Sequence, residues 1–329
     1  MGDCISFIDN GIWKNPIQVY NLKVHKQSLK FYYCTENHEL KIDMENIEKL
    51  DPVILESKYN NRPFSIDITY QPDGMPKPII LHIHGFKGFK DWGYFNQLAE
   101  YAAMNGFVFI KMNFSHNGTT PENPLDFVDL EAFGSNNFSI EQSDLATVTD
   151  YVYSNEFVVD KNELDLGRFY LTGHSRGGAA VVLKGFHDHR VKAVASWAGI
   201  NDLSKHFSIT EVDQWKEKGV MYIENSRTKQ LMPLYYQIVE DFLENKDFLN
   251  LPQAIKTFSK PLCIIHGSED PTVPVRVAYL TQKWNPNVEL HIVEGADHVF
   301  NGGHPWNSPE LPENVKTVMN LTMDFFNSL

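Results

Sequence analysis

One serine lies between glycines in the stretch YLTGHSRGGAA, where a strand-like run meets a helix-forming run. Gly173 and Gly177 frame Ser175 in the pattern Gly-x-Ser-x-Gly. A nucleophile on so tight a strand-to-helix turn needs neighbours without bulk, and the turn lifts its hydroxyl above the sheet edge. The N-terminus of the following helix favours developing negative charge. Because the pentapeptide also occurs by chance, a glycine-rich turn with a solvated serine is the alternative interpretation.

A serine hydroxyl needs a general base, and that base needs an acid to orient it. Asp270 follows the strand-like run PLCIIHG, and His298 follows the run VELHIVEG. In α/β sheets with this turn the chain order is nucleophile, acid and histidine. The carboxyl ends of parallel strands share one edge of the sheet. The sequence therefore predicts a triad of Ser175, Asp270 and His298.

Acyl transfer also needs two N–H donors for the oxyanion of its tetrahedral intermediate. One donor is expected from the backbone of Arg176, directly after the nucleophile, and the other from the loop after an early strand. The stretch HIHGFKGF offers Phe86 in such a loop, and Gly85 and Gly88 permit close backbone approach. We therefore expect the backbone N–H groups of Phe86 and Arg176 to form the oxyanion hole.

Other residues compete for the acid and the base. Glu269 is adjacent to Asp270, but the proline at 271 can fix the turn around Asp270. Asp202 follows an earlier strand-like run and is the main alternative acid. His304, in the stretch GGHPW, is the alternative histidine, and its ordinary interpretation is a loop residue near the mouth of the site.

The sequence shows no recognisable set of metal ligands. The three cysteines, Cys4, Cys34 and Cys263, match neither a metal site nor a disulfide framework, so reduced thiols are expected. His82 and His84 share the parity of one strand, yet no carboxylate or cysteine accompanies them at ligand spacing. We therefore expect no metal and no cofactor.

The elements that must position these residues alternate along the chain from about residue 64. Several strand-like runs are apolar on both parities, which is typical of strands covered on both faces by helices. Alternation of strands and helices predicts an α/β fold with a mostly parallel central sheet and helices on both faces. The strand-like runs are 65–71, 78–85, 106–114, 168–175, 191–199, 261–267 and 288–295.

Four motifs, HGFKG, GHSRGG, HGSEDPTVP and GADHVF, occur in this order. Together they resemble the α/β-hydrolase superfamily, and within it the dienelactone-hydrolase-like and feruloyl- or cinnamoyl-esterase-like bacterial enzymes. The resemblance extends from about residue 52 to the end of the chain. It implies an α/β-hydrolase fold whose eight-stranded sheet carries a helical cap after the sixth strand, and a serine esterase that uses no cofactor.

These observations divide the chain into three parts. Residues 52–200 and 261–329 form the expected core, and residues 201–260 interrupt the alternation with a mostly helical segment, the expected cap. A long insertion between core strands is usually functional or a separate subdomain. Residues 1–51 form an N-terminal extension outside the family pattern. Extra strands, a cover for a sheet edge and a homodimer contact are all open alternatives for it.

Composition limits the partners and the location. The chain has 329 residues and a formal net charge of −13 at pH 7. So acidic a chain lacks the basic surface that nucleic acid requires. No apolar run approaches the length of a membrane span, and the first residues show no secretory signal pattern. We therefore expect a cytoplasmic protein with a small-molecule substrate.

The leading hypothesis is a serine hydrolase that cleaves carboxylic esters through an acyl-enzyme intermediate. Thioester or peptide cleavage is the alternative within enzymes, because the same machinery serves all acyl transfers. A non-catalytic binding protein on the same fold is the alternative from another class. Such proteins usually lose part of the triad, whereas every part is present here.

Overall fold

The computed structural model describes residues 23–24, 27–28, 46–207 and 212–329. Contacts divide the chain into two units, Met1–Asn46 and Ile47–Leu329. In the first unit, β1 (Lys23–Val24) and β2 (Gln27–Ser28) form a short antiparallel pair. The rest of the expected N-terminal extension before residue 46, with Cys4 and Cys34, lies outside the described residues.

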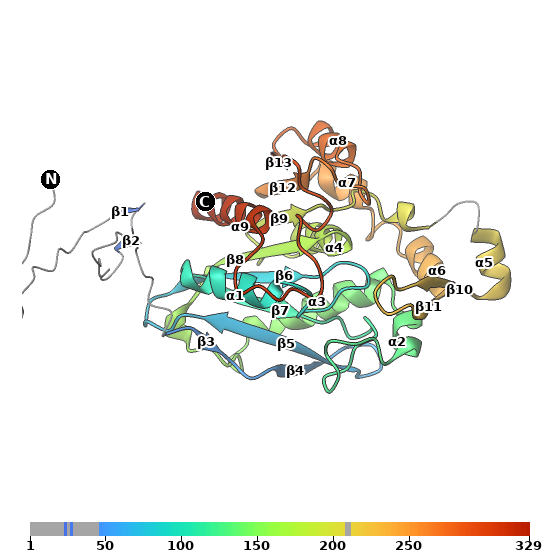
Figure 1. Ribbon diagram of the computed structural model, residues 1–329, viewed down its shortest axis with the longest axis horizontal. Helices are drawn as coiled ribbons and strands as arrows, with labels where there is room; N and C mark the ends of the chain where they lie inside the picture. The colour runs from blue at the N-terminus through green and yellow to red at the C-terminus, as the bar shows by residue number, and fades with distance from the viewer. Residues whose placement is uncertain (1–22, 25–26, 29–45, 208–211) are drawn as a thin grey trace, which may run out of the picture. The chain divides into compact units, whose positions relative to one another are not determined.

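A nine-stranded sheet forms the centre of the second unit (Figure 1). Its strands run in the order β13-β12-β9-β8-β6-β7-β5-β3, and β4 also pairs with β5. The six strands from β13 to β7 are parallel, whereas β3, β4 and β7 each pair with β5 in antiparallel fashion. The strands are β3 (Glu48–Lys49), β4 (Val53–Glu56), β5 (Pro63–Tyr70), β6 (Lys77–Ile83), β7 (Val108–Met112), β8 (Leu164–His174), β9 (Ala193–Trp197), β12 (Leu262–Gly267) and β13 (Glu289–Val293).

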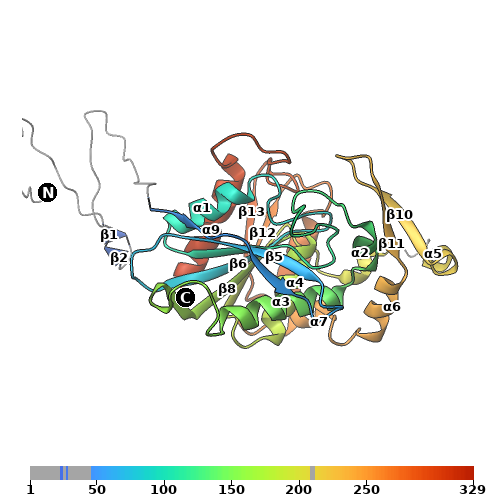
Figure 2. The same ribbon diagram turned by 90° about the horizontal axis from the view of Figure 1, so that it is seen from below.

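Helices cover both faces of this sheet (Figures 1 and 2). On one face, α1 and α9 enclose a core that includes Ile80, Phe109 and Tyr170. On the other face, α3 and α4 enclose a core that includes Ile79 and Leu81. The helices of the second unit are α1 (Phe95–Met104), α2 (Leu130–Ser135), α3 (Phe138–Val152), α4 (Arg176–His187), α5 (Val212–Lys218), α6 (Gln237–Glu244), α7 (Leu251–Lys256), α8 (Arg276–Trp284) and α9 (Glu313–Asn327), with short 3₁₀ turns at Lys161–Glu163 and Leu203–His206.

Burial on both faces explains the apolar composition of the central strands. Every residue of β6, β7, β9 and β12 is buried. Alternate side chains enter opposite cores because successive side chains of a strand point to opposite faces. The prediction of a mostly parallel sheet with helices on both faces is therefore confirmed.

The segment 201–260 differs from a purely helical insertion. It contains α5, α6 and α7, but also an antiparallel hairpin of β10 (Val220–Glu224) and β11 (Leu231–Tyr235). Met232 and Leu234 of the hairpin are buried, and the Trp215 indole N–H donates to the Leu234 carbonyl over 2.7 Å. The apolar side chains of this segment thus include a small core of their own.

The two ends of the insertion attach differently to the rest of the chain. The hairpin packs along α2, and α7 packs against α4 beside the main sheet. The hairpin is closed at its base because the backbone N–H of Tyr236 donates to the carbonyl of Gly219 over 2.9 Å. Among the described helices, none has the length and apolar character needed to cross a membrane.

Candidate active site

Ser175 lies on a strained turn between β8 and α4. Its φ of 56° and ψ of −118° place it in a region that residues with side chains rarely adopt. Its backbone N–H donates to the carbonyl of Trp197 over 2.8 Å. A Cβ atom on Gly173 would overlap the backbone of Gly177, and one on Gly177 would overlap the backbone of His84. The glycine spacing therefore reflects the close contact between the turn and its neighbours.

The structure brings Ser175, His298 and Asp270 together. Nε2 of His298 lies 3.0 Å from the hydroxyl oxygen of Ser175, and Nδ1 lies 2.7 Å from a carboxylate oxygen of Asp270. Asp270 follows β12 and His298 follows β13, and these strands are parallel neighbours. The side chain of Asp270 is fully buried, whereas that of His298 is 15% exposed. The arrangement is a continuous hydrogen-bond path from a buried carboxylate to a hydroxyl.

Asp270 is held by donors on both carboxylate oxygens. Oδ1 accepts from the backbone N–H groups of Thr272 and Val273, both over 2.8 Å. Oδ2 accepts from His298 and lies 3.2 Å from Nε2 of His266. Burial alone would raise the pKa of this carboxyl, but the hydrogen bonds from His266 and His298 outweigh burial and hold the pKa well below its usual range. Asp270 is therefore ionised wherever the protein is folded near neutral pH.

His266 and His174 are two polar neighbours of Ser175, Asp270 and His298. His266 is buried, and its Nε2–H also donates to the carbonyl of Val273 over 2.7 Å. Nε2 of His174 donates to the backbone carbonyl of His298 over 2.6 Å. Burial, followed by the neighbouring His298, lowers the pKa of His174 to about 3, so this ring stays neutral. The two rings hold the loops that carry Asp270 and His298.

The expected oxyanion donors lie on two segments that meet at the turn carrying Ser175. Arg176 is the first residue of α4, where backbone N–H groups point out of the helix toward its N-terminus. Phe86 lies in the loop after β6. A Cβ atom on the preceding Gly85 would be only 3.1 Å from that of Ser175, so this loop passes close to Ser175. Both residues are thus placed beside Ser175.

The side chains of these two residues also interact. The guanidinium carbon of Arg176 lies 5.2 Å from the ring centre of Phe86 and 4.6 Å from that of Phe138. Its Nη2 pairs with Glu141 on α3 over 2.8 Å, and both side chains are almost fully buried. Burial raises the pKa of the Glu141 carboxyl despite the opposing charge of Arg176. This buried cluster joins the loop after β6 to the first turn of α4.

The competing acids have other positions. Glu269 is exposed, whereas the neighbouring Asp270 is buried. Asp202 caps the short 3₁₀ turn at Leu203–His206, where it accepts from the backbone N–H of Ser204 over 3.0 Å and from the hydroxyl of Ser204 over 2.7 Å. Neither carboxylate has a hydrogen bond with His298 in the described part of the chain.

The competing histidines also have other partners. His304 accepts from the backbone N–H of Gly93 over 2.8 Å and packs edge-on against Phe89, in the loop after β6. His82 is buried in the core, where its Nδ1 meets the hydroxyl of Thr172 over 2.8 Å. His304 therefore supports the loop that carries Phe86 and is not part of the triad path.

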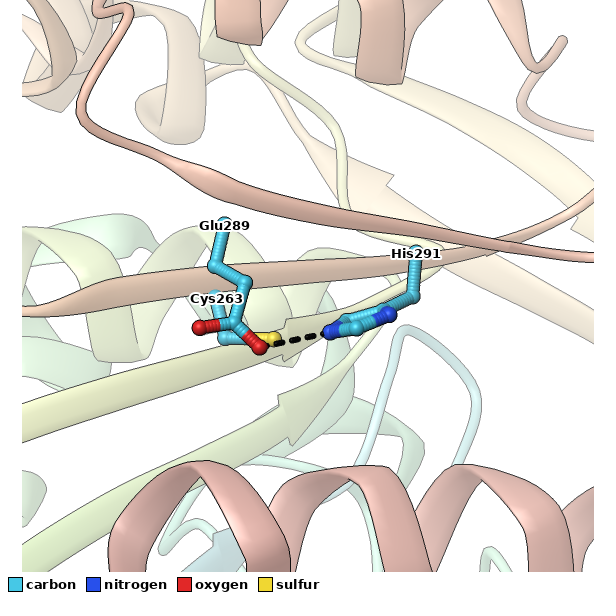
Figure 3. Close-up of side chains that lie close together, drawn as sticks. All are labelled: Cys263, Glu289 and His291. Carbon is cyan, nitrogen blue, oxygen red and sulfur yellow. Dashed lines mark hydrogen bonds and ion pairs between the residues drawn. The ribbon is translucent and has the colours of Figure 1, made fainter. Parts of the chain in front are cut away.

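One group of potential metal ligands lies outside this site. Cys263, Glu289 and His291 bring one ligand atom each to within 4.8 Å of one another (Figure 3). Within the residues that the structure describes, no other group of three or more histidine, cysteine, aspartate or glutamate side chains meets this condition, and His82 and His84 are not in one.

Solved structures of hydrolases share this fold. The esterase domain of a Rhodothermus marinus protein matches with a TM-score of 0.56 and 16% identity, over 86% of this chain and 98% of that one. Est1E from Butyrivibrio proteoclasticus matches with a TM-score of 0.55 and 15% identity, over 84% and 99%. The acylaminoacyl peptidase of Pyrococcus horikoshii matches with a TM-score of 0.56 and 17% identity, over 85% of this chain but 42% of that one.

These likenesses, at such low identity, establish the α/β-hydrolase fold that the motifs predict. No curated protein sequence matches the chain. The family model described as the prolyl oligopeptidase family, Peptidase_S9, matches residues 132–312, which is more than half of the chain. The matched range includes Ser175, Asp270 and His298. The chain therefore belongs to the prolyl oligopeptidase family, a serine hydrolase family of the α/β-hydrolase superfamily.

Proposed function

We propose that this protein hydrolyses carboxylic esters through an acyl-enzyme formed on Ser175. The observation that carries the proposal is the hydrogen-bond path from Asp270 through His298 to Ser175, with distances of 2.7 and 3.0 Å. A hydroxyl within reach of an oriented imidazole is the arrangement that nucleophilic acyl transfer requires. The esterases among the similar structures support the ester as substrate.

In the proposed mechanism, Ser175 attacks the ester carbonyl while Nε2 of His298 takes the hydroxyl proton. The backbone N–H groups of Phe86 and Arg176 stabilise the oxyanion of the tetrahedral intermediate. His298 then gives its proton to the leaving alkoxide, which leaves the acyl group on Ser175. A water molecule, activated by the same imidazole, releases the acid and restores the hydroxyl.

Asp270 has two roles in this scheme. Its Oδ2 keeps the proton of His298 on Nδ1, so that Nε2 is the basic nitrogen that faces Ser175. It also stabilises the imidazolium that forms during proton transfer. Because its pKa is held low, Asp270 keeps its negative charge throughout the reaction.

Peptide or amide hydrolysis is the second candidate, and a specific observation favours it. The family model is that of a peptidase family, and the Pyrococcus horikoshii peptidase is among the similar structures. The same triad can protonate an amine leaving group as well as an alkoxide. The two candidates therefore differ in the leaving group and not in the residues that act.

The nucleophile is tested by the variant Ser175→Ala. We expect it to lose labelling by a fluorophosphonate probe and at least about a thousandfold in kcat/KM for p-nitrophenyl acetate, because no other group replaces the attacking oxygen. Ser204→Ala, which removes an exposed hydroxyl in the insertion, is the matched control and should retain both. Labelling that survives in Ser175→Ala would show that another residue is the nucleophile.

The substrate class is tested by a panel of esters, thioesters and aminoacyl p-nitroanilides with matched acyl groups. We expect the highest kcat/KM on esters, with the loss in Ser175→Ala equal across the panel. A higher kcat/KM on the anilides than on the matched esters would favour the peptidase. Absence of turnover on every substrate, with intact probe labelling, would contradict hydrolysis of these classes.

A further inference from the structure

Cys263, Glu289 and His291 lie on the two neighbouring strands at one edge of the sheet (Figure 3). The parallel register pairs Cys263 of β12 with Glu289 of β13, and Ile265 with His291. Because alternate residues of a strand share a face, all three side chains belong to the same face. Two hydrogen-bonded strands therefore position them, and no flexible loop is involved.

The chemistry of these three groups matches a transition metal. Thiolate, imidazole and carboxylate are the ligands that zinc takes in proteins, at about 2.3 Å for sulfur and about 2.0–2.2 Å for nitrogen and oxygen. Tetrahedral ligands at such lengths lie about 3.3–3.7 Å apart, and the three atoms here are within 4.8 Å. Small side-chain rotations close the remaining gap. We propose that these residues bind a divalent zinc-class ion, with water as the fourth ligand.

The environment of each ligand fits such a site. Cys263 is completely buried, so the sulfur lies at the inner end of the site. The side chains of His291 and Glu289 are 30% and 48% exposed, which gives an ion a path from solvent to the sulfur. Nε2 of His291 lies 2.7 Å from a carboxylate oxygen of Glu289. A bound ion would replace this hydrogen bond with one coordinate bond to each side chain.

Cysteine, histidine and glutamate also occur together in sites where a cysteine is the nucleophile, but the arrangement here differs from that of such a site. In the site around Ser175, the two nitrogens of His298 face different partners. In Figure 3, His291 turns one nitrogen toward both Glu289 and the sulfur, so the ring cannot relay a proton from the thiol to the carboxylate. Convergence of three ligands on one point is the geometry of ion binding.

An ion at this position would join β12 to β13. The loops after these strands carry Asp270 and His298, whereas Cys263 and Glu289 lie at the beginning of their strands and His291 lies in the middle of β13. Binding should therefore stabilise this edge of the folded protein without contact with the triad. The site is expected to affect the melting temperature more than the rate of hydrolysis.

The first experiment uses the full chain with Cys4→Ser and Cys34→Ser, so that Cys263 is the sole thiol. Titration with Co²⁺, a coloured substitute for Zn²⁺, should give one ion per chain and a near-ultraviolet thiolate-to-metal charge-transfer band, which Zn²⁺ then displaces. Loss of an outer partner alone costs about 10- to 100-fold in metal affinity. Adding Cys263→Ala or His291→Ala should therefore weaken binding at least about a hundredfold, and Glu289→Gln at least about tenfold.

The matched control is His187→Ala, which removes a histidine at the end of α4 and should leave binding unchanged. Circular dichroism and fluorophosphonate labelling check that each variant folds. Binding without a charge-transfer band would show an adventitious ion on surface histidines and would overturn the proposal. So would a Cys263→Ala protein that binds as tightly as its parent, or a melting temperature that Zn²⁺ fails to raise in the parent.

Discussion

The carboxylate of Asp270 is fixed by its own loop before it meets the histidine. Two backbone N–H groups hold Oδ1, so only Oδ2 is directed toward His298. Glu269 is one residue away but exposed, and among the described residues no backbone N–H group donates to its carboxylate. The difference between these neighbours is therefore one of backbone geometry and not of chemistry.

Replacing Asp270 with asparagine should test this distinction. The amide retains the shape of the carboxylate but can donate toward Nδ1 of His298, which favours the wrong tautomer. In serine proteases the equivalent change costs about 10⁴ in kcat. We expect Asp270→Asn to lose at least about a hundredfold in kcat/KM on one good ester, with its circular dichroism spectrum unchanged.

The comparison variants are Glu269→Gln and Asp202→Asn. Both should remain within about tenfold of the parent, which is about 1.4 kcal/mol of barrier. Asp202→Asn removes a cap on a short 3₁₀ turn and not a partner of the histidine. If Asp202→Asn were the inactive variant and Asp270→Asn nearly normal, the acid would be wrongly assigned.

At this scale, the sequence predicts the residues that follow strands and misses those that depend on side-chain direction. The proximity of Ser175, Asp270 and His298 could be predicted because each follows a strand-like run in a fixed chain order. The contact of Arg176 with Glu141 spans 35 positions and depends on how α3 packs beside α4. His266 offered one signal, its position four residues before Asp270, but a histidine inside an apolar strand is usually part of the core.

Between elements, the cluster of Arg176, Glu141, Phe86 and Phe138 links the loop after β6 with α3 and α4. Arg176→Met would keep the length of the side chain and remove the charge that pairs with the buried Glu141. We expect the loop that carries Phe86 to lose its fixed position, and kcat on esters to fall by about ten- to a hundredfold. KM should change less, because the lost interaction stabilises the oxyanion rather than the bound ester.

The double variant Arg176→Met/Glu141→Gln separates positioning from stability. Removing both charges should recover much of the free energy of unfolding, since no unpaired carboxylate then remains buried. The loss in kcat should persist, because the contact between Arg176 and Phe86 is still absent. Recovery of kcat together with stability would mean that the cluster acts on folding alone.

The hairpin of β10 and β11 can be removed where its ends already meet. Tyr236 N–H donates to the carbonyl of Gly219, so residues 220–235 can be replaced by a two-residue turn. We expect the sheet to fold and kcat/KM for large acyl groups, relative to acetyl, to change by about tenfold or more. Tyr235→Phe, which removes only the hydrogen bond to Glu131, is the smaller control. An unchanged ester panel would contradict a role of the hairpin in substrate selection.

The sequence predicts the core strands better than it predicts this insertion. Strands buried on both faces carry continuous apolar runs, which have few other interpretations between turn residues. The runs VMYIE and LMPLY of the hairpin are short, VMYIE has no buried residue, and the apolar residues of both runs also fit a helix. Their pairing is decided by contact with α2, which lies about 100 positions earlier in the chain.

For the whole molecule, buried neutral histidines set the dependence of stability on pH. Burial lowers the pKa of His84 and His116 to about 4 and of His174 to about 3, and lowers the pKa of His82 well below its usual value. The unfolded chain takes up these protons near pH 6.5. The stability that each neutral ring contributes is therefore complete above about pH 6.5 and is lost as pH falls toward about 4.

We expect the free energy of unfolding to fall between about pH 6.5 and 4, by about 3 kcal/mol for each of the fully buried rings of His84 and His174. Asp144 and Glu141 oppose this trend, because burial raises the pKa of Asp144 to about 6 and also raises the pKa of Glu141, but the four histidines outnumber them. Urea unfolding at several pH values measures the slope. His82→Gln should flatten it, and the exposed His187→Gln should not. A free energy of unfolding that stays constant down to pH 4.5 would contradict this account.

The order of strands is the part of the fold that the sequence leaves undetermined. Alternation predicts parallel strands and helices on both faces, yet it does not state that β6 lies between β7 and β8. That order depends on which face each crossover helix covers. The motif resemblance predicts only that the loops after β8, β12 and β13 lie at one edge of the sheet, and the order of the strands comes from the structure.

The close packing around the turn that carries Ser175 has a consequence for directed evolution of this protein. Gly173, Gly177, Gly178 and Gly199 each lack room for even one methyl group, because a neighbouring backbone or the Ser196 hydroxyl occupies that space. Random mutagenesis at these positions would yield mostly inactive clones. Productive diversity lies instead in the β10–β11 hairpin, whose side chains can change while Ser175 keeps its place. New substrate preferences should therefore be selected from libraries of that hairpin, with the glycines held constant.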